Sequence, residues 1–256
     1  MKPVKLIYTA CILVLGCCLL VSCGKDELTE PATVVCTFQV ESQIPMGGAL
    51  VFERIDLNLS RLDISGRRSG ENDMFFSRKF DKLSGNFQLL QTEASSTRLQ
   101  IPQGTYESLV FYLTPNEEDY EFEYGSVGED DETGDLAEYL LNAKPGVLVV
   151  ARYTNGSVSF PVIISLNDDI RRFALEVSQA GSSTVVLRKE MVSQATVLID
   201  PAYWFTAITT TMLENAVTFP LNGEDAVVIS EDYNENLHNL IAGRLEGSAS
   251  VTFEAL

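Results

Sequence analysis

Hydrophobic and polar residues alternate along much of the chain, which is the pattern of a β-strand with one buried face. The clearest run places three hydrophobic residues on one face: Ile55, Leu57 and Leu59. Leu62 and Ile64 then continue the alternation, but at even-numbered positions instead of odd-numbered ones. Because one extra residue reverses the faces of a strand, we expect a β-bulge between the two runs, near Ser60 and Arg61.

Further runs of strand-forming residues are bounded by turn residues. They span residues 87–91, 97–101, 106–113, 147–154, 157–164, 172–177, 183–187, 195–199 and 251–253. The pair Asn155-Gly156 between two of these runs predicts a two-residue hairpin, because both positions tolerate a positive φ. The segment 102–105 predicts another turn, after which the chain returns as the strand over 106–113.

Helical spacing of hydrophobic residues appears only late in the chain. One helix is expected over 202–216, because an Asp-Pro pair at 200–201 supplies a cap and a first-turn proline. A second is expected over 233–245. Many short strands and one or two short C-terminal helices predict a mainly β protein. Its expected form is an antiparallel β-sandwich, immunoglobulin- or transthyretin-like, over residues 34–256. Either one domain or two, divided near 116–145, fit this pattern.

The amino terminus has the layout of a secretory signal peptide. Lys2 and Lys5 precede an apolar run over 6–21, which is too short and asymmetric to favour a permanent membrane span. The run ends in Leu20-Val21-Ser22-Cys23, which resembles the lipobox of bacterial lipoproteins. The resemblance implies export, cleavage of residues 1–22, and a membrane anchor through lipid on Cys23. An unlipidated signal anchor is the alternative.

Two further resemblances concern destination and family. Residues 23–33 form a polar, lipidated tether, and Gly24-Lys25-Asp26-Glu27 resembles the signal that sends Bacteroidota lipoproteins to the outer face of the outer membrane. Ile-Pro-Gln-Gly-Thr-Tyr at 101–106 resembles the Leu-Pro-x-Gly-x-Tyr turn of uncharacterised bacterial β-sandwich lipoproteins. Residues 199–205 and 236–253 resemble the carboxy-terminal pattern of such surface lipoproteins. These families are generally binding or accessory proteins, which is the role that the resemblance implies.

Charge narrows the choice of partner. The chain has 18 basic and 36 acidic residues and a net charge of −18. Cleavage after residue 22 would remove Lys2 and Lys5 and no acid, so the net charge would become −20. This balance argues against nucleic acid and anionic lipid as partners, because both require a positively charged protein surface.

Few residues are candidates for chemistry. After lipidation and cleavage Cys36 would be the remaining thiol, so no intramolecular disulfide is expected, and its apolar surroundings predict a buried side chain. His238 is the only histidine, which disfavours zinc and papain-like sites. Trp204 is expected in the core. No catalytic residue, cofactor or metal is predicted.

One segment is a candidate ligand site. Residues 116–135 are rich in carboxylates, with Tyr120, Phe122 and Tyr124 between them. Clustered carboxylates can bind calcium, but the spacing matches no EF-hand, and a solvated acidic loop is the favoured interpretation. If the segment is a strand, the three aromatic residues share one face, where rings could stack on a sugar while carboxylates accept its hydrogen bonds. Packing of these residues in a core is the alternative.

The sequence therefore favours a non-enzymatic lipoprotein, anchored in the outer membrane and exposed at the cell surface, that binds a glycan or an envelope protein. The alternative is a structural subunit of a fimbria-like assembly, in which the strand over 33–40 passes between subunits. A small hydrolase with paired carboxylates is a third hypothesis.

Overall fold

The computed structural model describes residues 30–41, 44–70, 73–81, 84–91, 95–116, 145–167, 173–179, 184–221 and 223–255. Several predictions from the sequence lie outside these ranges. They concern the signal peptide, the lipidation of Cys23, the binding role of Tyr120, Phe122 and Tyr124, and the domain boundary near 116–145. No helix in the described part of the chain is long and apolar enough to cross a membrane.

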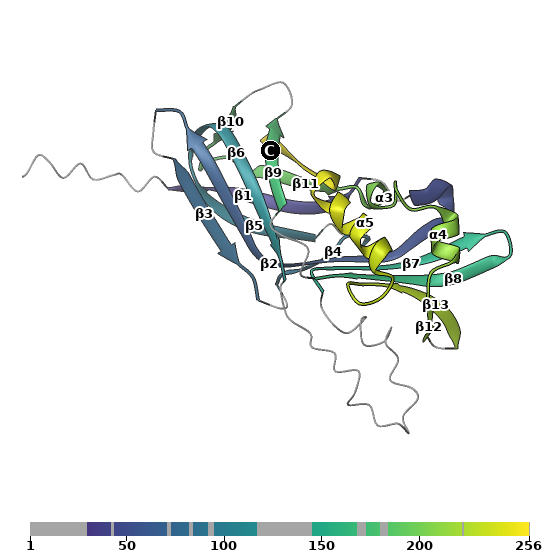
Figure 1. The fold of residues 1–256 in the computed structure, drawn as a ribbon. Helices are drawn as coiled ribbons and strands as arrows, with labels where there is room; N and C mark the ends of the chain where they lie inside the picture. The colour runs from purple at the N-terminus through teal and green to yellow at the C-terminus, as the bar shows by residue number, and fades with distance from the viewer. Residues whose placement is uncertain are drawn as a thin grey trace, which may run out of the picture.

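The described chain is mainly β, as predicted. The strands are β1 (Pro31–Val40), β2 (Leu50–Arg68), β3 (Met74–Lys79), β4 (Asn86–Gln88), β5 (Ser95–Pro102), β6 (Gly104–Pro115), β7 (Val147–Asn155), β8 (Val158–Leu166), β9 (Phe173–Gln179), β10 (Val185–Leu187), β11 (Ser193–Ile199), β12 (Thr218–Leu221), β13 (Glu224–Ile229) and β14 (Ala249–Ala255). Their main hydrogen-bonded order is β12-β13-β8-β7-β2-β6-β9-β14-β11-β1-β5, with β3 and β4 also on β2 and β10 on β6. Figure 1 shows an elongated molecule, with β3, β6 and β10 toward one end and β7, β8, β12 and β13 toward the other.

Strand β2 runs the length of this molecule and belongs to two parts of the sheet. Its first half pairs with β4 and β7, and its second half pairs with β3 and β6. Leu50 lies opposite Tyr153 at one end, and Arg68 lies opposite Tyr106 at the other. The register of β2 against β6 shifts between Leu59 and Arg61, so the predicted bulge is confirmed where the strand changes partners.

The sheet is not purely antiparallel, which corrects the prediction. Three neighbouring pairs run parallel: β1 with β11, β8 with β13, and β9 with β14. Alternation along a strand reports which face is buried, but it carries no information on the direction of the neighbour. The partners in these pairs are separated by long stretches of chain, so no tight turn forces them to be antiparallel.

The hairpin predicted at Asn155-Gly156 is confirmed, but its two-residue loop is one position later, at Gly156 and Ser157: Asn155 still pairs with Val158, and of the predicted pair only Gly156 has a positive φ, of +61°. The turn predicted over 102–105 does not join two paired strands. Strand β5 pairs with β1, whereas β6 pairs with β2, β9 and β10, so the chain turns a corner there instead of closing a hairpin. The buried Tyr106 fixes this corner, because its hydroxyl donates a 2.5 Å hydrogen bond to the carbonyl oxygen of Pro102.

The helices number three in the described chain, one more than the prediction allowed: α3 (Pro201–Trp204), α4 (Thr210–Glu214) and α5 (Glu235–Leu245). Short 3-10 turns add η1 (Pro45–Gly48) and η2 (Glu246–Ser248). The single helix predicted over 202–216 is wrong, because Thr209 starts a second helix by accepting a hydrogen bond from the backbone of Met212. The predicted cap is present, since Asp200 accepts from the backbone amides of Ala202 and Tyr203. The helices lie on one face of the β7–β8–β13 part of the sheet (Figure 1).

Candidate functional site

Three residues singled out from the sequence lie inside the described core. Cys36 is fully buried on β1, and burial raises the pKa of its thiol to about 12. Trp204 and His238 are also buried. The predictions of a buried thiol and a core tryptophan are therefore confirmed, and none of these side chains is presented to solvent.

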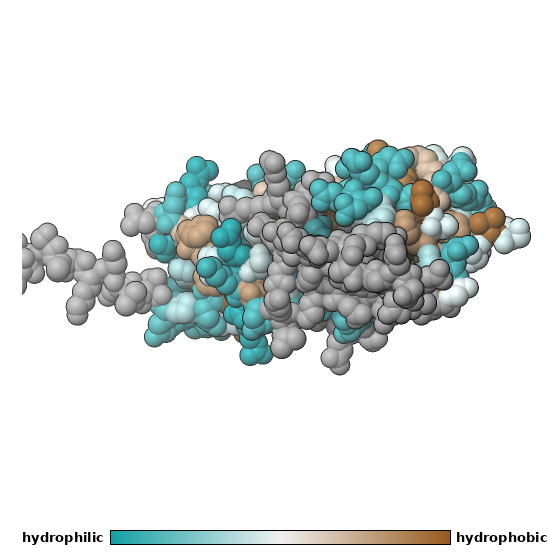
Figure 2. Space-filling model, turned by 60° about the horizontal axis from the view of Figure 1, so that its bottom comes forward, coloured by the Kyte–Doolittle hydropathy of each residue, from teal (hydrophilic) through white to brown (hydrophobic). Residues whose placement is uncertain are grey.

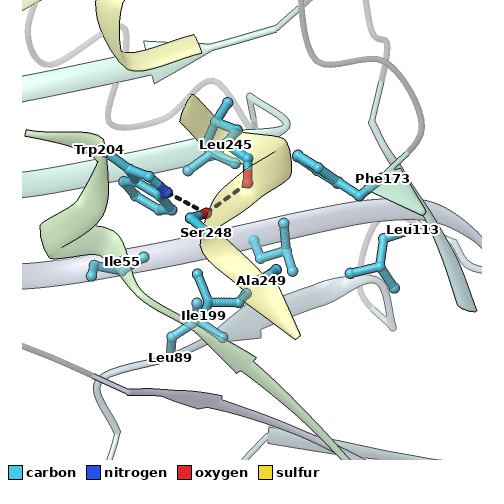
Figure 3. Close-up of a pocket in the computed structure, with 11 residues that line it drawn as sticks. Ile55, Leu89, Leu113, Phe173, Ile199, Trp204, Leu245, Ser248 and Ala249 are labelled. Atoms are coloured by element: carbon cyan, nitrogen blue, oxygen red, sulfur yellow. Dashed lines mark hydrogen bonds between the residues drawn. The ribbon is translucent and has the colours of Figure 1, made fainter. Parts of the chain in front are cut away.

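A small cavity of about 20 Å³ lies where β2, β6, β7, β9 and β11 meet the helices (Figure 3). Its walls are almost entirely hydrophobic. The lining residues are Ile55, Leu57, Leu89, Leu113, Val147, Phe173, Ile199, Trp204, Leu245, Ser248 and Ala249. This volume is enough for about one water molecule and far below the several hundred cubic ångströms of a typical ligand pocket.

The single hydroxyl in the cavity wall is already satisfied. The Oγ of Ser248 accepts a 2.6 Å hydrogen bond from Nε1 of Trp204 and donates one of 2.6 Å to the carbonyl oxygen of Leu245. Figure 3 shows both bonds at the edge of the cavity. A water or polar ligand would find no open partner here, so the cavity is a packing void and not a reactive site.

A buried polar cluster marks the point where β2 changes partners. The side-chain amide of Asn58 donates a 2.6 Å hydrogen bond to the carbonyl oxygen of Pro145 and accepts one of 2.7 Å from Asn86. Its backbone amide bonds to Gly146, and its carbonyl accepts from Asn116. Asn58 thus joins β2 to the ends of three other segments, which is a structural task.

Asp56 lies next to this cluster. Among the described carboxylates that have an oxygen without a hydrogen bond, it is the most buried. Its Oδ2 lies 2.8 Å from Nε of the half-exposed Arg54, whereas its Oδ1 has no hydrogen-bond partner among the described residues. The Arg54 cation compensates the buried charge. Within the described ranges no three His, Cys, Asp or Glu side chains gather closely enough to hold a metal ion.

The hairpin end of the molecule carries a network of charged and polar side chains. Arg152 lies between Glu53 and Glu224, at 3.6 and 3.1 Å. Glu214 accepts hydrogen bonds from Tyr153 and Asn155. Both bonds lower the pKa of its carboxyl group, and the bond from Tyr153 has the larger effect. Arg152 already has two carboxylate partners, so the network offers no unmatched positive charge to a ligand.

An unmatched group of charges lies instead between two edge strands, β3 and β5. Here Arg78 and Arg98 are exposed, and neither has an ion pair within the described structure. Nη1 of Arg78 donates a 3.3 Å hydrogen bond to the backbone oxygen of Arg98, and its guanidinium lies 5.5 Å from the centre of the Phe80 ring. We call these two arginines, with the facing edges of β3 and β5, the basic seam. The sequence could not reveal it, because the two strands come together only through the sheet topology.

No family model, curated protein or solved structure matches this chain.

Several hydrophobic side chains are exposed in the described part of the chain. They include Val51, Phe75, Val158, Val192 and Val217. On the visible part of the face in Figure 2, hydrophobic surface residues are separated by hydrophilic ones.

Proposed function

We propose that this chain is a lipoprotein whose domain is anchored to the outer membrane through Cys23, faces the cell exterior, and serves as a binding or accessory protein. Its ligand would be a glycan or an envelope protein. We also propose that the packed sheets form a sandwich of the immunoglobulin- or transthyretin-like type. The observation that carries the proposal is the position of the first strand relative to the candidate anchor.

Strand β1 begins at Pro31, close after Cys23 in the sequence. The seven residue steps from Cys23 to Glu30 can span at most about 25 Å. Pro31 lies opposite Pro102, beside the corner fixed by Tyr106, so the anchor would hold this end of the molecule near the membrane. An ion pair of 2.8 Å between Glu30 and Lys189 ties the start of the chain to the same end.

The hairpin at Asn155-Gly156 would then point away from the membrane. Strand β2 spans 19 residues between the two ends, which corresponds to about 60 Å of extended chain. A domain held at one end by a short tether, with its long axis free to project outward, suits a protein that meets partners outside the cell.

The anchor is tested by metabolic labelling with palmitate. The wild type and a Cys18→Ala variant should incorporate label and sediment with membranes, whereas Cys23→Ala should do neither. Labelling of Cys23→Ala at the wild-type level would contradict the anchor. Ligand binding is tested by affinity electrophoresis of residues 24–256 against a panel of polysaccharides, with and without calcium. Retardation by one glycan supports a glycan ligand, and no retardation directs the search to protein partners.

The structure gives one specific observation in favour of the assembly alternative. Strand β1 lies between β5 and β11, with three alternate side chains fully or almost fully buried: Val34, Cys36 and Phe38. Withdrawal of this first strand would leave a slot that the same strand of another copy fits. A ladder of species in unboiled gels would support exchange between subunits, and a single monomer band would count against it.

A further inference from the structure

The tip of the β7–β8 hairpin carries an exposed asparagine directly before a glycine. Asn155 is the last residue of β7 and pairs with Val158, and it is exposed together with the loop residues Gly156 and Ser157. The backbone amide of Gly156 donates no hydrogen bond to any residue that the structure describes. Glycine has no Cβ to shield this nitrogen, and asparagine is one of the thermolabile residues of proteins. When the end of the strand opens, the nitrogen can reach the side-chain carbonyl carbon of Asn155.

One side-chain contact restrains Asn155. Its Nδ2 donates a 2.9 Å hydrogen bond to Oε1 of Glu214 at the end of α4, and the hydroxyl of Tyr153 donates one of 2.7 Å to the same oxygen. Figure 1 shows α4 beside this end of the β7–β8 hairpin. While the bond from Asn155 is formed, it restricts the rotation of the side chain that a reaction with Gly156 requires. The bond is exposed, so it opens at small cost.

We propose that Asn155 is a site of spontaneous deamidation and that Glu214 controls its rate. The nitrogen of Gly156 loses its proton to water and attacks Cγ of Asn155. The new N–Cγ bond closes a succinimide ring, and the Cγ–Nδ2 bond breaks as Nδ2 leaves as ammonia. Water then opens the ring at Cγ to give aspartate, or at the backbone carbonyl carbon to give isoaspartate. Water is the only co-reactant, and no atom is oxidised or reduced.

Either product replaces the hydrogen-bond donor beside Glu214 with a second carboxylate. The bond from Asn155 is lost, and the two negative charges repel each other. Isoaspartate also adds a methylene to the main chain, which disturbs the pairing with Val158. The reaction therefore weakens the link between the hairpin and α4, leaving the bond from Tyr153, and adds negative charge at this end of the molecule. The inference depends neither on the proposed anchor nor on the proposed ligand.

The reaction is followed by mass spectrometry of the purified protein at pH 8 and 37 °C, with a free peptide of residues 151–160 as the reference. Trypsin releases residues 153–171, which separates Asn155 from Asn222, the other asparagine that precedes a glycine. Fragment spectra locate the gain of about 1 Da within this peptide. We expect conversion at Asn155 in the folded protein, at a lower rate than in the free peptide. An unchanged Asn155 when the free peptide is fully converted would overturn the proposal.

Two alanine variants on the same helix test the role of Glu214. Glu214→Ala should speed the conversion about fivefold, because it removes a hydrogen bond to a charged group. Thr211→Ala removes another exposed side chain of α4 and should leave the rate within about twofold of the wild type. Equal rates in the two variants would overturn the proposal.

Asn155→Asp supplies one product directly. It should raise the pKa of the Glu214 carboxyl, because a negative charge takes the place of a hydrogen bond that lowers this pKa in the wild type. Titration of the carboxyl by NMR measures the change. An unchanged pKa would mean that residue 155 does not act on Glu214, and the control of the reaction by this residue would be refuted.

Discussion

The indole of Trp204 and the hydroxyl of Ser248 form a buried 2.6 Å hydrogen bond that joins α3 to the end of η2, directly before β14. The same hydroxyl donates to Leu245 at the end of α5. One serine therefore links α3 and α5, the two helices that contribute to the cavity wall, and gives the buried indole N–H its acceptor.

Ser248→Ala should destabilise the protein by about 1–3 kcal/mol, because it leaves the Trp204 N–H buried without an acceptor. Trp204 is the only tryptophan in the chain, so its fluorescence during urea unfolding reports this region directly. Ser250→Ala, on the exposed side of β14, is the control and should stay within about 0.5 kcal/mol of the wild type. Equal midpoints for the two variants would show that the bond is not needed.

Asn58→Ala should be more damaging than Asn86→Ala. The first change leaves both the carbonyl of Pro145 and the amide of Asn86 unpaired, at a cost of about 2–4 kcal/mol. The second removes only one of these bonds, and about 1 kcal/mol is expected. Urea unfolding measures both costs, with the slope of the unfolding free energy against urea concentration compared between the variants. A smaller loss for Asn58→Ala than for Asn86→Ala would contradict the role of Asn58 at the crossing of β2.

Two glycines should respond differently to alanine. At Gly85 a Cβ would lie 2.1 Å from the backbone oxygen of Leu59, so Gly85→Ala must displace the main chain. At Gly156 a Cβ would meet nothing within 4 Å, and only the positive φ opposes it. We expect a loss of about 1 kcal/mol for Gly156→Ala and several times more for Gly85→Ala. Thermal unfolding measured by circular dichroism compares them, and similar melting temperatures would refute the clash.

Local features of this fold could be predicted from the sequence because short-range chemistry determines them. Alternation placed the buried face of β2, and its change of parity located the bulge near Arg61. Asn155-Gly156 predicted its hairpin, and Asp200 its helix cap, because each acts on neighbours within a few residues. The long helix over 202–216 was wrong because helical spacing continues across a break that Thr209 caps.

Features that depend on topology could not be predicted. Nothing near Val34 in the sequence indicates that β1 runs parallel to β11, or that β5 turns away from β6 after Pro102. Arg78 and Arg98 are twenty residues apart and read as ordinary exposed charges until the sheet places them at one seam. The meeting of these two arginines is therefore a product of the fold, whereas the candidate anchor at Cys23 rests on sequence alone.

Cys36 gives the last prediction, which concerns pH. Burial raises the pKa of its thiol from about 9 in the unfolded chain to about 12 in the folded protein. Below pH 9 the thiol is protonated in both states, so its contribution to stability is complete. Between pH 9 and 12 only the unfolded chain loses the proton, so stability falls by up to about 1.4 kcal/mol per pH unit.

The stability advantage of the wild type over Cys36→Ala should therefore shrink as the pH rises from 8.5 to 10.5, while lysine and tyrosine titrations affect both proteins alike. Urea unfolding of residues 24–256 at each pH measures the difference, and a constant difference would exclude the buried thiol as its source. In the same protein Cys36 is the only thiol, so a maleimide should label it only after unfolding. Rapid labelling under native conditions would mean that β1 leaves its place between β5 and β11, as exchange between subunits requires.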